Sequence, residues 1–445
     1  MNHSEKHHEI SEELIYNIHR ELHARTSIPI NSPARIRHTA YYFSAEDNAA
    51  RNKIIKTFDD VLSQLKIKKE NIRNEDRACF AEKSFGADGS LLLLWEIHSE
   101  FYSYTTILMP KKKDVKNPFD FKPYSLPIFY TLGKKMLDLS ILVMPGSKQD
   151  KNTKSFLREG TLYGGHVLNG AAQVYTTFQI NETGQERYLV LSGKLSPGRI
   201  GRLVRRLIEV ENYYHLILLP LPEYKEHIAR LRKKEKMIAK DSEQIAIDLA
   251  DKDIDTQKEH HWLVKLTRNL AELIRLTENM RFRFSAASSY YRIFNERLAW
   301  LREKTGENYQ SINEFLTARV SPAVHNYENF IERSEALSSQ LTALGNMIRT
   351  RINQLMERQN LKTLEVMNKR VKLQIKLQET VEGLSIIVLS YYMTSLSGYL
   401  FQAIEKITML PGGYKLWTAL TIPVWFLTAF IISKRVKNII SKKME

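Results

Sequence analysis

The sequence has one cysteine, Cys79, among 445 residues. A single cysteine excludes an intrachain disulfide and every zinc motif that needs several cysteines, and an unpaired thiol is typical of a reducing cytoplasm. The sequence also lacks the phosphate-binding motif G-x-x-x-x-G-K-[ST], the nucleophile motif G-x-S-x-G and an EF-hand loop. We therefore expect neither an enzyme nor a bound cofactor.

The N-terminus, MNHSEKHHEISEEL, lacks the apolar core of a secretory signal, so we expect the N-terminal bulk of the chain in the cytoplasm. The chain carries a formal charge of +16, from 66 basic and 50 acidic residues. Such a charge suits nucleic acid, an anionic membrane surface or a solvated basic face. No motif of a known nucleic-acid module occurs, and the basic clusters MNKRVKLQIK and SKRVKNIISKK flank apolar segments. The charge therefore favours a lipid bilayer over nucleic acid as partner.

Two long uncharged runs lie near the end of the sequence. The first, Gly383 to Ile404, has 22 residues and would reach roughly 33 Å as a helix. The second, Leu416 to Ser433, has 18 residues and would reach roughly 27 Å. Pro423 lies inside the second run, which membrane helices tolerate. We predict transmembrane helices at 383–404 and 416–433; a buried hairpin of a soluble protein is the alternative.

The charges around these runs predict their orientation. Basic residues precede the first run and follow the second, at Lys369, Arg370, Lys372, Lys376, Lys434, Arg435, Lys437, Lys442 and Lys443. The loop between the runs contains the turn signal Pro411-Gly412-Gly413. By the positive-inside rule the loop faces outward, and both termini, including a basic tail at 434–445, are cytoplasmic. We expect a multi-pass protein of a bacterial inner membrane.

Residues 33–220 predict a cytoplasmic α/β domain after an N-terminal helical segment, 1–32. Segments rich in β-branched and aromatic residues predict strands, in RIRHTAYYF, SLLLLWEIHSEFYSYTTILM, LDLSILVMP, LYGGHVL, AAQVYTTFQI and RYLVLSG. Helical spacing over 53–67 predicts a helix between strands, and a second helix is expected with Ser196 as N-cap and Pro197 at its first position. The fold class is therefore α+β, with long helices and the membrane hairpin following the domain.

Residues 221–382 are nearly free of glycine and proline and predict long helices. The segments ENYQSINEF and SPAV are expected to interrupt them near 307–324. A quasi-heptad stripe, Leu337, Leu341, Leu344, Ile348, Ile352 and Leu355, then favours packing in a helix bundle over one regular coiled coil. The last helix is expected to run from about Ser321 directly into the first span.

Histidines offer the one metal-like spacing in the sequence. His19 and His23 stand at i and i+4, as zinc-binding histidines do in H-E-x-x-H peptidases, but the glutamate of that motif is displaced to Glu21. A solvated helical surface is the more favoured interpretation of this pair. The histidines at 38, 98 and 166 lie in strand-like segments, where structural roles are favoured over a convergent site.

Five stretches together resemble an uncharacterised family of bacterial membrane proteins, a domain of unknown function. They are ELHAR with SPARIRH, HSEFYSYT, GRLVRRLIEVENY, RFRFSAASSYY and QETVEGLSIIVLSYYMTSLSGYL. The family pattern has proline after LHAR, where this sequence has Thr26. The resemblance covers nearly the whole chain and implies no catalytic residues.

The predicted layout is also similar to the CorA-type cation transporters, which are ring-shaped oligomers with the first span lining the pore. Their Gly-Met-Asn signature is absent; the sequence here reads SGYLFQA. The similarity implies a homo-oligomer that conducts a divalent cation. Its candidate pore-lining residues are Ser390, Thr394, Ser397 and Gly398, with Glu405 at the outer mouth.

Helix packing is the alternative interpretation of the same polar stripe, because small residues at such spacings also bring membrane helices together. The leading functional hypothesis is cation transport. The second is a non-transporting scaffold or sensor, anchored in the membrane, whose cytoplasmic domain binds a partner.

Overall fold

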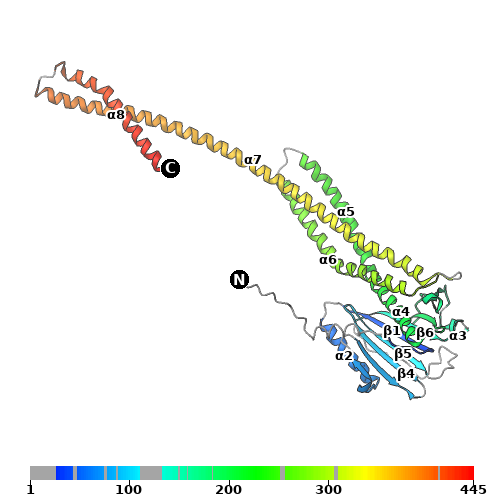
Figure 1. Ribbon diagram of the computed structural model, residues 1–445. Coiled ribbons are helices and arrows are strands. Elements are labelled where there is room, and N and C mark those ends of the chain that lie inside the picture. The colour runs from blue at the N-terminus through cyan, green and yellow to red at the C-terminus, as the bar shows by residue number, and fades with distance from the viewer. Residues whose placement is uncertain are drawn as a thin grey trace, which may run out of the picture. The chain divides into compact units, whose positions relative to one another are not determined.

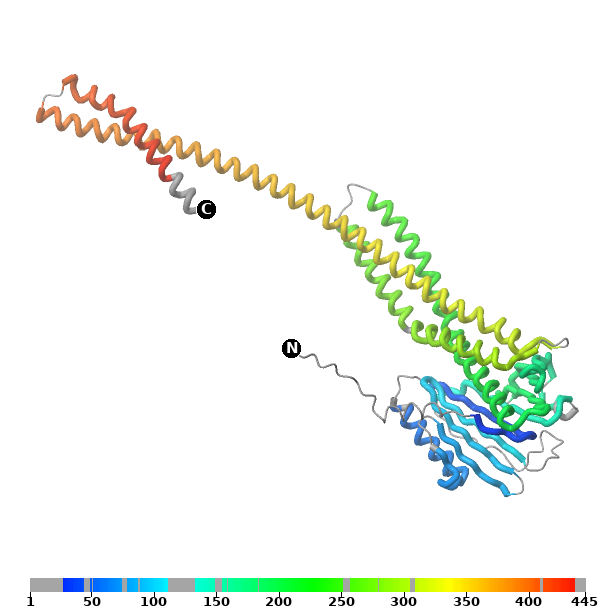
Figure 2. The backbone as a smooth tube through the Cα atoms, in the orientation of Figure 1, coloured from blue at the N-terminus to red at the C-terminus, as the bar shows by residue number. Residues whose placement is uncertain are grey.

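The computed structural model describes residues 27–43, 48–74, 78–86, 89–110, 133–148, 151–157, 159–182, 184–250, 256–304, 309–408 and 411–444. The predicted pair His19 and His23 lies outside these residues. The chain divides into two compact units (Figures 1 and 2): one contains Met1–Ala250 and Lys265–Ala343, the other Asp251–Val264 and Leu344–Glu445. The sheet thus belongs to one unit, together with the helical residues up to 343 except those before Lys265 that follow Ala250.

Within the described residues, the first unit holds a sheet of nine strands. They are β1 (Ala34–Tyr42), β2 (Ile72–Asn74), β3 (Ala78–Ser84), β4 (Gly89–Ile97), β5 (Phe101–Pro110), β6 (Lys134–Met144), β7 (Tyr163–Val167), β8 (Ala172–Thr176) and β9 (Glu186–Leu191). Their order across the sheet is β2-β3-β4-β5-β1-β6-β9-β8-β7. The β6–β9 pair is parallel and the other seven pairs are antiparallel. The strand nearest the N-terminus therefore lies at the centre.

Helices cover both faces of this sheet (Figure 1). On one face, α4 (Pro197–Leu218) packs its buried residues, such as Leu203 and Leu207, against Ile141 and Val190 of β6 and β9. On the other face, α2 (Asn48–Gln64) packs on β3, β4 and β5, where the Phe58 and Trp95 rings stack with centroids 5.0 Å apart. Apolar side chains of adjacent strand residues point to opposite faces, so both layers are buried.

The remaining short helices of the first unit are α3 (Lys151–Phe156) and the 3₁₀ turns η1 (Lys69–Asn71) and η3 (Leu168–Gly170). The predicted α+β class, the helix near 53–67 and the start of α4 at Pro197 after Ser196 are confirmed. The long apolar run from Ser90 to Met109 forms two strands, because the chain reverses after Ile97, where His98 N–H donates to the carbonyl oxygen of Phe101 at 2.8 Å.

Three long helices follow: α5 (Leu221–Ala250), α6 (Thr256–Trp300) and α7 (Ile312–Glu405). In the first unit their facing surfaces are aromatic, and the rings of Phe284 on α6 and Tyr327 on α7 stack 4.7 Å apart. Ion pairs tie the same helices at their edges: Lys234 and Glu272 lie 2.6 Å apart, and Lys265 and Asp241 2.7 Å apart. The predicted helix bundle is therefore built from an aromatic core with charged edges.

The expected interruption at SPAV is wrong, since Pro322 lies inside α7. The break falls earlier, where the Glu303 carboxylate accepts the backbone N–H of Ile312 at 2.9 Å, and the Ser311 hydroxyl accepts that of Glu314 at 3.1 Å. These oxygens cap the helix start, and α7 begins nine residues before Ser321. A proline removes only one backbone hydrogen bond, and the buried Val320 and Val324 around it keep the helix packed.

The second unit contains α6 up to Val264, α7 from Leu344 onward, and α8 (Gly413–Met444). Two helices of the described residues, α7 and Gly413–Val436, are long and apolar enough to cross a membrane. The predicted spans lie inside them. Between them, Gly412 and Gly413 adopt φ angles of +87° and +76°, which favour glycine, so the predicted turn is present.

Candidate functional site

The predicted polar stripe in the hairpin uses its hydroxyl groups inside its own helix. Ser390 donates to the carbonyl oxygen of Ile386 at 2.7 Å, and Thr394 donates to that of Ser390 at 2.7 Å. Ser397 donates to the carbonyl oxygen of Met393 at 2.9 Å. Such bonds satisfy hydroxyls without water.

The same stripe faces α8. Trp425 of α8 donates its indole N–H to the Ser397 hydroxyl at 2.8 Å. A Cβ atom added to Gly398 would lie 3.2 Å from Cγ2 of Thr418, so glycine permits the close approach of the helices. Ser390 and Thr394 also line a cleft of about 760 Å³ whose walls are mostly apolar. The packing interpretation accounts for these contacts, and the pore-lining role of the stripe stays a prediction.

Glu405, the candidate for the outer mouth, ends α7. Its carboxylate accepts the backbone N–H of Tyr414 at 3.3 Å and so helps to cap α8. This contact gives Glu405 a structural role in closing the loop. Its role in attracting cations stays a prediction.

The three strand histidines do not form one cluster. His38 is fully buried, with Nδ1 2.8 Å from the Thr105 hydroxyl and Nε2 3.0 Å from the Asn212 side-chain oxygen. His166 lies on β7 at the far edge of the sheet, and the His98 ring stacks on Phe101. Since the Asn212 oxygen can only accept, His38 donates through Nε2, as a neutral structural histidine does. Burial lowers the pKa of His38 to about 4.

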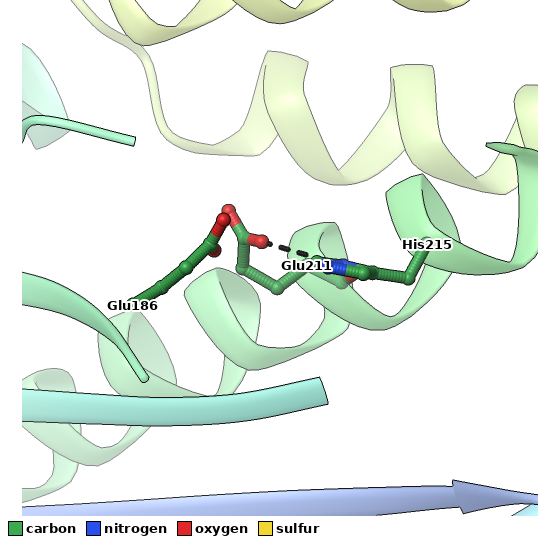
Figure 3. Close-up of side chains that lie close together, drawn as sticks. All are labelled: Glu186, Glu211 and His215. Carbon is green, nitrogen blue, oxygen red and sulfur yellow. Dashed lines mark hydrogen bonds and ion pairs between the residues drawn. The ribbon is translucent and has the colours of Figure 1, made fainter. Parts of the chain in front are cut away.

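A buried carboxylate pair, absent from the sequence-based predictions, lies between the sheet and α4 (Figure 3). Glu186 of β9 and Glu211 of α4 meet there, with His215 beside them, and one ligand atom from each lies within 4.8 Å of the others. Glu211 is fully buried and Glu186 is 6% exposed. The His215 side chain is 21% exposed, so the cluster reaches solvent at its histidine.

The local sequence explains why these groups meet. Strand alternation puts Glu186, Tyr188 and Val190 on the face of β9 that α4 covers. On α4 the buried stripe runs through Val204 and Leu207, and Glu211 occupies the next position of that stripe. The signal in the sequence was a glutamate at a core position of an amphipathic helix, with a histidine one turn later.

The carboxylates are only partly satisfied by the protein. The Tyr188 hydroxyl donates to Oε1 of Glu211 at 2.5 Å, whereas no N–H or hydroxyl group of the described residues donates to Oε2 of either glutamate. Among the ion pairs of the described residues, His215 alone lies within 4.0 Å of either carboxylate, with Nδ1 3.6 Å from Oε2 of Glu211. Burial, then the charge of Glu186 and a hydrogen bond between the two carboxyl groups, raise the pKa of Glu211 well above its usual range.

Two carboxylates and an imidazole are a ligand set for a divalent metal ion. Two buried negative charges side by side are costly unless a proton or a cation balances them. The Nδ1 of His215 lies 2.9 Å from the Glu211 carbonyl oxygen, an acceptor, so Nδ1 carries a proton there. Ligation through Nδ1 therefore requires the other tautomer, with the proton on Nε2.

A second site in the same unit also contains charged side chains, but their opposite charges balance. A cavity of about 270 Å³ beside β4, β5 and α4 is lined by two arginines and two glutamates. Arg205 lies 3.1 Å from Glu96, and Arg297 lies 2.6 Å from Glu209. Because these charges pair with one another, the cavity offers no uncompensated charge to a ligand, unlike the carboxylate pair.

The chain belongs to the family described as "Protein of unknown function (DUF3422)", whose model matches residues 12–440. The predicted resemblance to an uncharacterised family is thus confirmed over nearly the whole chain. No curated protein and no solved structure matches the chain. The comparisons therefore give no support to the similarity with the CorA-type group.

Proposed function

We propose that this protein is a membrane-anchored sensor of divalent cations, which binds the cation between Glu186, Glu211 and His215. The observation that carries the proposal is the convergence of two buried carboxylates and an imidazole, whose ligand atoms lie within 4.8 Å of one another. A proton shared between the carboxylates would connect only two of the cluster's atoms. A divalent cation contacts both carboxylates and the imidazole together and neutralises both charges.

The ligand set favours a first-row transition ion over Mg²⁺ or Ca²⁺, because imidazole is a good ligand for the former and the latter prefer oxygen alone. His215, at the solvent edge, is the point at which a hydrated ion would enter. We place the domain in the cytoplasm of a bacterium, with the hairpin in the inner membrane and both termini cytoplasmic, as the charge distribution predicts.

Binding is tested by thermal unfolding of the detergent-solubilised full chain with and without MnCl₂. A ligand at one hundred times its dissociation constant stabilises the folded state by about 2.7 kcal/mol. We expect Mn²⁺ to raise the unfolding midpoint of the wild type, and Glu211→Gln to abolish the rise. The variant should fold, because glutamine keeps the size of the side chain and can accept from Tyr188.

Glu226→Gln is the matched control: the same chemical change on α5, at a side chain that is 60% exposed. It should leave the Mn²⁺ response intact. An unchanged midpoint for the wild type in 1 mM MnCl₂, or an equal rise in Glu211→Gln, would contradict the proposed site. Comparison with MgCl₂ and CaCl₂ tests the preference for a transition ion.

Cation transport, the other function that the sequence predicts, remains a prediction carried by the polar stripe. In the hairpin the hydroxyls of Ser390, Thr394 and Ser397 already bond within the chain, which favours the sensor proposal. A flux assay in proteoliposomes distinguishes the two. Divalent-cation flux that is lost in Thr394→Leu would support transport, and absence of flux in both proteins would end that hypothesis.

A further inference from the structure

An apolar stripe runs along α7 within the second unit. Its residues step by four, four, three, four and three, and their exposed fractions lie between 46% and 71%. They are Leu373, Leu377, Val381, Leu384, Val388 and Tyr391. From Leu373 to Tyr391 the stripe is roughly 27 Å long. Such a row is unusual on a surface that faces solvent, because apolar helix faces normally pack against another element.

Apart from Tyr391, which lines the cleft with Thr418 and Ile422 of α8, the stripe points away from α8. Successive helix residues turn by about 100°, so Val381 and Ser390 project in roughly opposite directions. Ser390 is buried, and Ser397, which projects from nearly the same side, accepts the hydrogen bond from Trp425. Glu382, which projects about 80° from Ser390, also accepts from Ser433 of α8 at 2.7 Å. Helix α8 therefore does not cover the stripe from Leu373 to Val388.

The stripe also crosses the predicted membrane boundary at Gly383. Leu373, Leu377 and Val381 precede the first span, whereas Leu384 and Val388 lie inside it. Lipid tails can cover only the second group, and a soluble protein can cover only the first. An element that covers the whole stripe must itself run from the cytoplasm into the bilayer.

We propose that this stripe is the contact between two copies of the chain, with their α7 helices parallel and in register. A second copy presents the same helix at the same depth, because its spans fix its height in the membrane. Leu377 then meets Leu377, and Leu384 meets Leu384. Toward the N-terminus Arg370 lies on the same face of α7. The positive charges of the two Arg370 side chains, one from each copy, repel each other and end the contact there. The interface is independent of the proposed cation site.

Cysteine cross-linking in native membranes tests this interface. The only native cysteine, Cys79, is buried and burial raises the pKa of its thiol to about 11, so it gives little background. Leu377→Cys and Leu384→Cys should form disulfide dimers under mild oxidation. Glu379→Cys is the matched control, since it is exposed but turned by about 200° from Leu377.

At least a fivefold higher dimer yield at the two stripe positions than at Glu379→Cys is the expected result. Equal yields at all three positions, or no dimer at the stripe, would overturn the proposal. Adducts of a mass other than twice the chain would assign the stripe to a different membrane protein. In detergent, Leu377→Glu should convert the wild-type assembly to monomers in light scattering, whereas Glu379→Gln should not.

Discussion

Trp425 on α8 and Ser397 on α7 are joined by a hydrogen bond of 2.8 Å, in which the indole N–H donates to the hydroxyl oxygen. The same hydroxyl donates to the carbonyl oxygen of Met393, so its donor and one acceptor position are both used. A residue that was predicted to line a pore therefore connects the two helices of one hairpin. The bond lies within the predicted spans, where water is not a ready substitute.

Removing this bond should loosen the hairpin. We expect Ser397→Ala to lower the free energy of unfolding by about 1 kcal/mol, because the indole N–H of Trp425 loses its acceptor. Thermal unfolding in micelles measures the change. Ser385→Ala is the control, since the Ser385 hydroxyl is exposed and bonds only to Val381 of its own helix. Equal effects of the two substitutions would contradict a role in joining the helices.

Gly398 should not tolerate a large side chain. A Cβ atom there would lie 3.2 Å from the Thr418 methyl carbon, so Gly398→Leu must push α8 away and should cost about 2 kcal/mol. Gly383→Leu is the matched control, because no atom lies within 4 Å of the Cβ added at that position. Unfolding midpoints in micelles compare the variants. A larger loss at Gly383 than at Gly398 would show that the helices do not approach as described.

His38 should make stability depend on pH. Its pKa in the folded state is lowered to about 4, from 6.5 in the unfolded chain, so the unfolded chain binds the extra proton between these values. Stability from this group is complete above pH 6.5 and falls as the pH drops toward 4. Between these two pH values His38 loses a contribution of about 3 kcal/mol to the free energy of unfolding.

Chemical unfolding from pH 7 to pH 4 checks this dependence. Compared with the wild type, His38→Gln should lose less stability on acidification. Glu211, whose raised pKa has the opposite sign, is present in both proteins and drops out of the comparison. His325→Gln, at an exposed histidine, should follow the wild-type curve. Identical slopes for His38→Gln and the wild type would contradict a neutral, buried His38.

Local signals predicted most elements of the fold. Pro197 after Ser196 marked the start of α4, and the β-branched and aromatic residues of β1 and β9 marked strands. The start of α7 was predicted too late, because proline propensity is a local signal and the packing of Val320 and Val324 is not. The strand order could not be predicted, since β1 pairs with two strands far away in the sequence.

The candidate cation site was harder to predict than the fold. Glu186 and Glu211 come from a strand and a helix, and only the packing of α4 on β9 brings them together. In the sequence each is one glutamate among 50 acidic residues. The hydroxyl stripe, by contrast, was visible because its members share one helix. Spacing along a helix reveals a shared face, but not the partner that the face meets.

The central position of β1 sets the order in which the sheet can form. Its Arg37 pairs with Asp138, 101 residues later in the chain, and β6 in turn joins β9. A ribosome must therefore synthesise β1 long before its second neighbour exists. The entropy cost of closing such a large loop comes before the stabilising contacts form, and this slows folding. Until β6 arrives, one edge of β1 exposes open backbone groups, which makes the nascent chain a natural client for chaperones.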